Sequence, residues 1–445
     1  MSNGRYRAYP EYKDSGLAWL GRMPKTWELR KAKHLFERVQ RPVRESDGIV
    51  TAFRDGQVTL RSNRREDGFT NAVKEIGYQG VRKGDLLVHA MDGFAGAIGV
   101  SDSDGKCSPV CSVCSPWDKS QIDIRYYGYL VRQLAVTDYI TSLAKGIRER
   151  STEFRFSEFS VLELAIPPKN EQTQIAKFLD HETAKIDRLI EKQEELIRLL
   201  KEKRQAVISH AVTKGLNPHA PLKDSGIEWL GQVPTHWVVA GFKKYLSSIV
   251  DYRGKTPDKV DSGVFLVTAR NIKNGQVDYE AAQEFIKKSD YENVMARGKP
   301  KIGDILFTTE APLGEVALVD REDIALAQRI IKFDAQAHIL SNSFLKYLIT
   351  SDSFQQSLAM FASGSTALGI KAERFVYLRA LIPPLDEQSA IVRHIEQTIQ
   401  KLERIEKQAE AQTTFLQERR TALISAAVTG KIDVRHWQPS KNSAA

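Results

Sequence analysis

One stretch of this 445-residue chain occurs twice, and this repeat constrains every model of the fold. The residues DSGLAWLGRMPKTW at 14–27 return as DSGIEWLGQVPTHW at 224–237, with eight identities at the same spacing. Trp27 and Trp237 match at an offset of 224 − 14 = 210 residues. Each copy carries two tryptophans, although the whole chain has only six. Chance does not produce such a match, so the chain contains a duplication.

The duplication extends well beyond this motif. IPPKNEQTQIAKFLD at 166–180 returns as IPPLDEQSAIVRHIE at 382–396, and RQAVISHAVTKG at 204–215 returns as RTALISAAVTGK at 420–431. The offset here is 382 − 166 = 216, so the segment between the anchors differs in length between the copies. Solenoid repeats have periods of about 20 to 50 residues, far below this one. The sequence therefore predicts a tandem pair of whole domains.

The segments between the anchors, about 28–165 and 238–381, are predicted to be mixed α/β domains. GDLLVHA at 84–90 and GDILFTT at 303–309 begin after a Gly-Asp turn, as strands often do. YYGYLVRQLAVTDYI in the first copy carries apolar residues at helical spacing. The two segments thus share a skeleton while differing in most of their side chains.

A long helix is predicted after each Ile-Pro-Pro. Proline is tolerated at a helix start, and the acidic residues Glu171, Asp386 and Glu387 suit the positive end of the helix dipole. A helix from about 171 to 210 would be roughly 60 Å long at about 1.5 Å per residue. Apolar residues then recur in alternating three- and four-residue steps, which predicts a heptad seam. The exceptions are Glu182, Gln193 and Lys203 in the first helix and Thr398, Ala409, Gln412 and Arg419 in the second. The predicted seam residues are Ile175, Leu179, Ile186, Leu189, Leu196, Leu200 and Val207 in the first helix and Ile391, Ile395, Leu402, Ile405, Leu416 and Leu423 in the second.

The seam has two interpretations. Each helix can pack on its own globular domain, or the two helices can pack on each other. We favour the second, because matched registers within one chain provide an intramolecular partner at high effective concentration. The helices would then act as a ruler between two heads.

Composition sets broad limits on function. Sixty-five Lys and Arg against 56 Asp and Glu give a net charge of +9, which is compatible with a polyanionic partner. No apolar run approaches the roughly 18 residues that span a bilayer, and the N-terminal stretch has no signal-peptide segment. Three cysteines in so long a chain argue against a disulfide framework. We therefore expect a cytoplasmic protein.

The paired motifs resemble those of the DNA-specificity subunit of Type I restriction-modification enzymes. The resemblance rests on the two DSGxxWLGxxPxxW stretches, the two IPPxxEQxxI helix starts and the AVTKG and AVTGK helix ends, and it covers essentially the whole chain. It implies an α+β fold with two tandem mixed α/β target-recognition domains joined by two conserved spacer helices. These helices would form an antiparallel coiled coil with pseudo-two-fold symmetry. The expected boundaries are 1–165 and 216–381 for the recognition domains, and 166–215 and 382–445 for the spacer helices and C-terminal tail.

The resemblance also implies function and partners. The chain would read two halves of a bipartite, asymmetric target in double-stranded DNA, which a diverged duplication permits and a true homodimer does not. It would hold two modification subunits, which methylate adenine with S-adenosylmethionine, and restriction subunits, which need ATP and magnesium. This chain itself is expected to have no catalytic residues and to bind no cofactor, metal or membrane.

Reading DNA requires cations for phosphates, and Arg, Asn, Gln, Ser or Thr for base edges. In the first domain such residues gather in RSNRRED and KGIRERST, and in the second they gather in YRGKT, ARNIKNG and SGSTALGIK. GIRERST and GSTALGIK each follow a helix and precede a final strand, so they are the preferred base-reading loops. For any single residue a solvated surface charge remains an equal alternative. The candidates are Arg61, Asn63, Arg64, Arg65, Lys145, Arg148, Arg150, Ser151, Thr152, Arg253, Lys255, Arg270, Asn271, Lys273, Asn274, Ser363, Ser365, Thr366 and Lys371.

Two other functions compete with this prediction. CSPVCSVC contains every cysteine of the chain, Cys107, Cys111 and Cys114, at a spacing that resembles the iron-sulfur motif of radical S-adenosylmethionine enzymes. Aligning Gly96 with Gly314 places this stretch opposite ALAQRIIKF, a strand pattern without thiols. We therefore interpret the cysteines as small residues on a strand. A coiled-coil scaffold that does not bind DNA is the third hypothesis.

Overall fold

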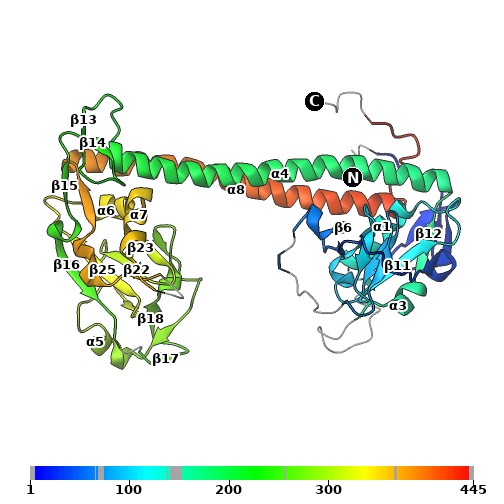
Figure 1. Ribbon diagram of the computed structural model, residues 1–445, viewed down its shortest axis with the longest axis horizontal. Coiled ribbons are helices and arrows are strands. Elements are labelled where there is room, and N and C mark those ends of the chain that lie inside the picture. Colours follow the sequence, from blue (N-terminus) through cyan, green and yellow to red (C-terminus); the bar gives the residue numbers. More distant parts are fainter. Residues whose placement is uncertain are drawn as a thin grey trace. The chain divides into compact units, whose positions relative to one another are not determined.

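The protein consists of two compact units (Figure 1). Unit 1 comprises Met1–Gln193 and Ala411–Ala445, and unit 2 comprises Glu194–Glu410. Two long helices, α4 (Lys169–Lys214) and α8 (Leu385–Val428), contribute residues to both units. Within the described ranges, no helix combines the length and apolar character needed to cross a membrane. The computed structural model describes residues 6–65, 67–68, 75–137, 139–140, 153–254, 257–364 and 368–439.

Unit 1 is built around a four-stranded antiparallel sheet with the strand order β4-β11-β8-β9. Helix α1 packs on β9. Strand β12 leads into α4 and pairs with β3. Besides α4, its elements are β1 Tyr12–Asp14, β2 Arg22–Pro24, β3 Glu28–Lys31, β4 Phe36–Arg38, β5 Val50–Ala52, β6 Val58–Leu60, β7 Gln79–Val81, β8 Leu86–His89, β9 Ile98–Val100, β10 Gly105–Cys107, β11 Cys111–Pro116, α1 Ile124–Val136, α3 Phe156–Ser160 and β12 Glu163–Ile166.

Unit 2 contains an antiparallel sheet of the same kind, β16-β25-β22-β23, and a second sheet, β17-β21-β18-β24, in which β18 and β24 are parallel. Helices α6 and α7 lie between the first sheet and the long helices (Figure 1). Besides α8, its elements are β13 Leu222–Asp224, β14 Gln232–Pro234, β15 Val238–Gly241, β16 Leu246–Asp251, β17 Lys259–Val260, β18 Val264–Val267, β19 Ile272–Lys273, β20 Gln276–Val277, β21 Phe285–Ile286, α5 Tyr291–Val294, β22 Ile305–Thr309, β23 Leu313–Leu318, β24 Ile324–Leu326, β25 Ile330–Ala335, α6 Asn342–Thr350, α7 Asp352–Phe361 and β26 Arg379–Ile382.

The strands predicted after the two Gly-Asp turns are confirmed as β8 and β22. In each turn the aspartate accepts the backbone N–H three residues before it, at 2.7 Å for Asp85 and 2.8 Å for Asp304. Both carboxylates are buried and each has a cationic partner, Arg41 for Asp85 and Lys332 for Asp304. A buried charge is tolerated because it is paired in this way.

The glutamine of each IPPxxEQ stretch ties the start of its long helix to the domain. Gln172 accepts the backbone N–H of Asp123 at 2.9 Å, and Asp123 caps α1. Gln388 accepts the backbone N–H of Ser341 at 2.8 Å, and Ser341 precedes α6. The same side chain therefore makes the same bond in both units, which aligns Asp123 with Ser341.

The neighbouring glutamate explains why the tryptophan motif is repeated. In unit 1, Glu171 is buried and its Oε1 accepts the indole N–H of Trp27 at 2.7 Å and the hydroxyl of Tyr9 at 2.5 Å. Burial and this hydrogen bond to Glu171 raise the pKa of the Tyr9 phenol. In unit 2, Glu387 accepts the indole N–H of Trp237 at 3.1 Å. Each glutamate with its tryptophan is called a joint below.

Each joint also holds the end of the other long helix. Gly430, just after α8, packs on Trp27, because a Cβ at this glycine would lie 3.1 Å from the indole. Gly215, just after α4, packs on Trp237 in the same way, at 3.3 Å. Both glycines have a positive φ, +69° and +77°, the left-handed conformation common at helix ends. Trp27 and Trp237 are therefore packing residues.

Ion pairs join the two long helices within each unit. In unit 1, Arg420 contacts Asp187 at 2.8 Å, and in unit 2, Arg204 contacts Glu403 at 3.2 Å. The residues correspond, since 420 − 204 and 403 − 187 both equal the helix offset of 216. In a further ion pair of unit 2, Lys201 contacts Glu406 at 3.5 Å. Lys201 precedes Arg204 in α4, whereas Glu406 follows Glu403 in α8, so the helices run antiparallel there.

The predicted heptad seam is only partly buried. Val207 and Leu423 are part-buried, whereas their neighbours Ile208 and Ile424 are each 3% exposed and lie in the cores. A straight α-helix drifts by about 20° per heptad from a 3.5-residue repeat, which carries the buried stripe off the predicted positions. Ile175, Leu179, Ile186, Leu200, Ile391, Ile395 and Leu416 are buried, Leu402 is part-buried, and Leu189, Leu196 and Ile405 are exposed.

The unit 1 joint is predicted to be a main source of stability. Trp27→Phe removes the indole donor, so Glu171 keeps one partner fewer and a small cavity opens. We expect a loss of about 2–4 kcal/mol of unfolding free energy in unit 1. Hydrogen exchange of the full chain, followed by mass spectrometry, checks this by resolving peptides of each unit.

Trp117→Phe is the matched control, because Trp117 is 62% exposed. Unit 1 peptides should lose protection in Trp27→Phe alone, and unit 2 peptides should keep theirs in both variants. Equal protection in the two variants would show that the joint does not stabilise unit 1.

Candidate nucleic-acid interface

Four predicted site residues of unit 1, Arg61, Asn63, Arg64 and Arg65, lie beside the β5–β6 hairpin. Arg61 donates from Nε to the Thr51 hydroxyl at 3.0 Å, and Asn63 donates to the Thr59 hydroxyl at 3.0 Å. These bonds hold both side chains against the hairpin. Arg64 pairs with Asp55 at 2.7 Å, and its guanidinium lies over the Phe53 ring. Arg65 follows and is exposed, so the structure does bring these four residues together.

Several predicted site residues lie outside the described residues. Most belong to the two preferred base-reading loops, GIRERST and GSTALGIK. Ser363 directly precedes the second loop and is exposed, and its backbone exchanges hydrogen bonds with Gly369 of that loop at 2.9 and 3.0 Å. Lys371 is also exposed. The candidates that are not described are Lys145, Arg148, Arg150, Ser151, Thr152, Lys255, Ser365 and Thr366.

Arg270 in unit 2 is held in place by a carboxylate. It forms an ion pair with Glu284, whose side chain is 14% exposed and also contacts Lys259 at 2.7 Å. The Arg270 side chain itself remains 64% exposed. A guanidinium has five N–H donors, so the pairing fixes its direction and leaves other donors available.

Arg329 lies on the same hollow as Arg270. The hollow has a volume of about 410 Å³, and Thr268 and Gln328 also line it. Arg329 forms an ion pair with Glu310, with 2.9 Å between Nε and Oε1, while the Arg329 side chain is 51% exposed. Gly369 of the second predicted loop bridges to Glu310, so this loop borders the same carboxylate. Two arginines, each held by a glutamate, therefore flank one hollow.

Arg253 forms a separate cationic position in unit 2. It pairs with Asp251, and its guanidinium is partly exposed. Arg297 donates to the backbone carbonyls of both residues, at 2.7 Å for Asp251 and 2.5 Å for Arg253. This side of unit 2 thus presents two adjacent arginines, of which the sequence prediction included only Arg253.

The prediction that Asn271 touches DNA is wrong. Asn271 is fully buried. Its Oδ1 accepts the backbone N–H and the hydroxyl of Thr268, and its Nδ2 donates to the carbonyls of Asp278 and Ala282. The Oδ1 and Nδ2 groups that would contact a base are therefore already hydrogen-bonded within the protein. Asn271 stabilises the conformation of the loop before β19.

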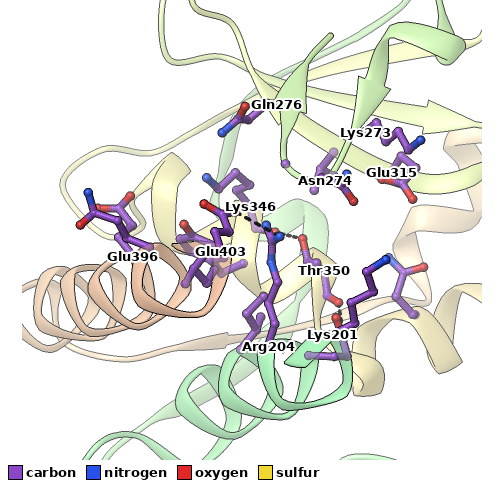
Figure 2. Close-up of a pocket in the computed structure, with 18 of the residues that line it drawn as sticks. Lys201, Arg204, Lys273, Asn274, Gln276, Glu315, Lys346, Thr350, Glu396 and Glu403 are labelled. Carbon is purple, nitrogen blue, oxygen red and sulfur yellow. Dashed lines mark hydrogen bonds and ion pairs between the residues drawn. The ribbon is translucent and has the colours of Figure 1, made fainter. Parts of the chain in front are cut away.

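Lys273 and Asn274 belong to a tight hairpin turn between β19 and β20. Asn274 and Gly275 both have positive φ, +53° and +80°, as a type I′ turn requires. The turn faces a cleft of unit 2 with a volume of about 1160 Å³, here called the unit 2 cleft. Figure 2 shows the turn residues across this cleft from Arg204 and Glu403 of the long helices. Lys273 and Asn274 are therefore separated from Arg270.

Charges of both signs line the unit 2 cleft. Arg204 and Lys201 already pair with glutamates of α8, as described above. Lys346 of α6 has its Nζ 4.3 Å from the centre of the Tyr347 ring. Burial lowers the pKa of Lys346, and the carboxylate of Glu396 only partly offsets this. The charged lining residues are Lys201, Arg204, Lys273, Lys346, Arg393, Glu315, Glu396, Glu403 and Glu406.

The three cysteines lie on strands β10 and β11, as the alignment of the two copies predicted. All three are free and buried. Cys107 and Cys111 are packed in one core cluster and Cys114 in another. Burial raises the pKa of the Cys114 thiol. Among the described residues, no group of three or more His, Cys, Asp or Glu side chains is arranged to hold a metal ion.

Sequence reasoning missed Lys259, Arg297, Arg329 and Lys346. Each is a single cation outside a dense cluster, so composition gave no signal for it. A short repeat does mark the hairpins, because DGQV at 55–58 returns as NGQV at 274–277. This repeat identifies a turn that both units share.

Asn271→Ala tests the structural role of this side chain. The substitution leaves buried donors and acceptors of the β19 loop unpaired, and each such group costs about 1–3 kcal/mol. We expect a lower urea midpoint for unit 2, measured on the full chain by hydrogen exchange at increasing denaturant. Lys273→Ala, at an exposed position two residues later, should change stability by no more than about 0.5 kcal/mol. Equal stability of the two variants would restore Asn271 as a candidate DNA contact.

Part of the chain matches a known protein family. Residues 244–413 match the family model of the Type I restriction modification DNA specificity domain. The chain is similar to the MjaVIII specificity subunit of a Type I restriction enzyme from Methanocaldococcus jannaschii, with 25% identity over 284 residues. That match covers 62% of this chain and 64% of the relative, slightly less than two thirds of its length.

Two further similarities cover more of the chain. The EcoKI specificity subunit of a Type I restriction enzyme from Escherichia coli is 22% identical over 450 residues, which covers 94% of this chain and 91% of that protein. A solved structure described as showing complex assembly and conformational transition of the type I R-M system has a TM-score of 0.66 and 14% identity, covering 91% of this chain and 98% of that chain. At that identity the likeness concerns the fold.

Proposed function

From matches that all indicate a Type I restriction-modification specificity subunit, we propose that this chain reads two halves of a bipartite, asymmetric DNA target. Each unit contributes one reading surface. The long helices hold the two surfaces apart as an antiparallel coiled coil, so their length sets the gap between the half-sites. The recognition domains are residues 1–165 and 216–381, and the spacer helices begin at 166 and 382.

The observation that carries this proposal is the contrast between joints and surfaces. Glu171 with Trp27 and Glu387 with Trp237 repeat the same contact in the two units. The cations of the proposed reading surfaces do not repeat, since Arg329 of unit 2 stands opposite Cys111 of unit 1 in the aligned copies. A constant frame with different reading surfaces suits an asymmetric target.

The hollow of unit 2 supports a specific mode of base reading. Arginine recognises guanine with two donors directed at O6 and N7 in the major groove. Glu284 and Glu310 each direct one arginine, Arg270 and Arg329, and leave further donors exposed. We assign these two residues to base reading and Arg253 to phosphate contact.

The chain is proposed to have no catalytic role. Its partners are double-stranded DNA, two methyltransferase subunits and the restriction subunits that complete the complex. In this proposal S-adenosylmethionine, ATP and magnesium bind to those partners. The present chain only positions the partner subunits on the DNA target.

Methylation mapping tests the function. The chain is co-expressed with an adenine methyltransferase subunit of the same kind of system, and modified adenines are located by single-molecule sequencing. We expect methylation at one bipartite motif with a fixed gap. A stable complex that methylates no such motif would contradict the proposal and favour a scaffold without DNA reading.

Single substitutions test the base-reading assignment. Arg270→Ala and Arg329→Ala should each relax one base pair in one half-site, because a bidentate contact provides about 1–3 kcal/mol of discrimination. Arg321→Ala is the matched control, since Arg321 is also an exposed arginine of unit 2 paired with a carboxylate, Asp323, and does not line the hollow. If all three variants methylate the wild-type motif, the assignment is wrong.

A further inference from the structure

The unit 2 cleft lies apart from the base-reading residues assigned above. None of Arg253, Arg270 and Arg329 lines it. The β19–β20 turn, strand β23, helices α6 and α7, and the α4 and α8 segments of unit 2 converge there (Figure 2). The cleft therefore lies between the variable domain and the spacer-helix segments of unit 2.

Lys346 is a partly buried cation without an ion-pair partner among the described residues. Its side chain passes beneath the turn, because a Cβ at Gly275 would lie 4.0 Å from Nζ. Burial removes water from the ammonium group, and Glu396 compensates only in part. An unpaired cation in such a place costs stability unless an anion enters from outside. Lys273 and Arg393 line the same cleft and are exposed.

The lining of the cleft favours a polyanion over a protein surface. Protein interfaces usually have an apolar and aromatic centre. Here the apolar lining residues Ile208, Val316, Ile399 and Tyr347 are buried, each less than 9% exposed. The accessible groups are amides and charges of both signs, and among them the cations Lys273, Lys346 and Arg393 suit phosphate oxygens.

Unit 1 provides an internal comparison. Aligning Asp123 with Ser341 gives an offset of 341 − 123 = 218, so Lys346 corresponds to Gly128. Gly128 packs tightly on Val100 of β9, which leaves no room for a lysine there.

Unit 1 places its cation one helical turn later, at Arg132. Arg132 packs directly against Gly56, the turn residue that corresponds to Gly275, and donates to the carbonyl of Arg54 at 3.2 Å. In unit 1 the Arg132 side chain thus fills the space beneath the hairpin turn, whereas in unit 2 the corresponding space around Lys346 is open.

We propose that the unit 2 cleft binds the sugar-phosphate backbone of DNA, with Lys346 and Lys273 contacting phosphates. The proposal rests on the proposed function and extends it from the hollow to the spacer helices. Backbone contacts carry no sequence information, so this site sets affinity and register for the second half-site while Arg270 and Arg329 read bases.

Salt-dependent DNA binding tests the proposal. The full chain is titrated with a duplex carrying its methylation motif and with an unrelated duplex at several salt concentrations. Lys346→Met keeps the length of the side chain and removes the charge. We expect roughly tenfold weaker binding of both duplexes at low salt, and a plot of log K against log salt whose slope is smaller by about one unit. Lys346→Arg should keep the wild-type slope.

Stability separates this role from a structural one. Because Lys346 is desolvated and unpaired, Lys346→Met should unfold at a temperature no lower than the wild type while it binds DNA less tightly. Lys401→Met is the matched control, since Lys401 is an exposed lysine of α8 that does not line the cleft. It should leave the salt slope unchanged.

Three results would overturn the proposal. An unchanged slope in Lys346→Met would mean that no phosphate occupies the cleft. Intact DNA binding with loss of the methyltransferase subunit would assign the cleft to an acidic protein surface. If the wild-type chain retains neither duplex at low salt, the proposed function fails together with this inference.

Discussion

A carboxylate at the start of each long helix, buried at Glu171 and partly exposed at Glu387, organises the unit to which it belongs. Glu171 and Glu387 accept hydrogen bonds from indole groups that lie 144 and 150 residues before them in the chain. A buried carboxylate is costly without such donors, so the tryptophan motif, the helix start and the domain between them must come together. The glycine after the other long helix packs on the same indole, which completes a unit from three separated pieces of chain.

This arrangement separates what must stay constant from what can vary. The joint uses the glutamate, the tryptophan, the neighbouring glutamine and a terminal glycine, and all four recur in both copies. The residues that face the hollow and the unit 2 cleft take no part in the joint. Arg329 can therefore stand where unit 1 has a cysteine, and Lys346 where unit 1 has Gly128, without disturbing the frame. A protein that reads different sequences with one architecture needs this independence.

The sequence predicted the frame better than the surfaces. The repeated motifs, the strands after the Gly-Asp turns and the two long helices are local patterns, and the structure contains each of them. The predicted seam is exposed at Leu189, Leu196 and Ile405 and only part-buried at Val207 and Leu423. A seven-residue repeat and a 3.6-residue helix drift apart over many turns. Asparagine beside cations suits base edges, so the sequence predicts a DNA contact for Asn271, yet the two carbonyls that accept from its Nδ2 lie seven and eleven residues away in a folded loop. Arg329 gains its role only from Glu310 and from the hollow, and both depend on tertiary packing.

Exchange of one recognition segment tests the central claim that two independent readers share one frame. Residues 28–165 are replaced by the corresponding segment of another chain of this kind, which keeps Trp27 and Glu171 and therefore the unit 1 joint. The adenines methylated by the resulting complex are then mapped. The account predicts a new sequence in one half of the motif, with the other half and the gap unchanged. A change in both halves, or in the gap, would contradict it.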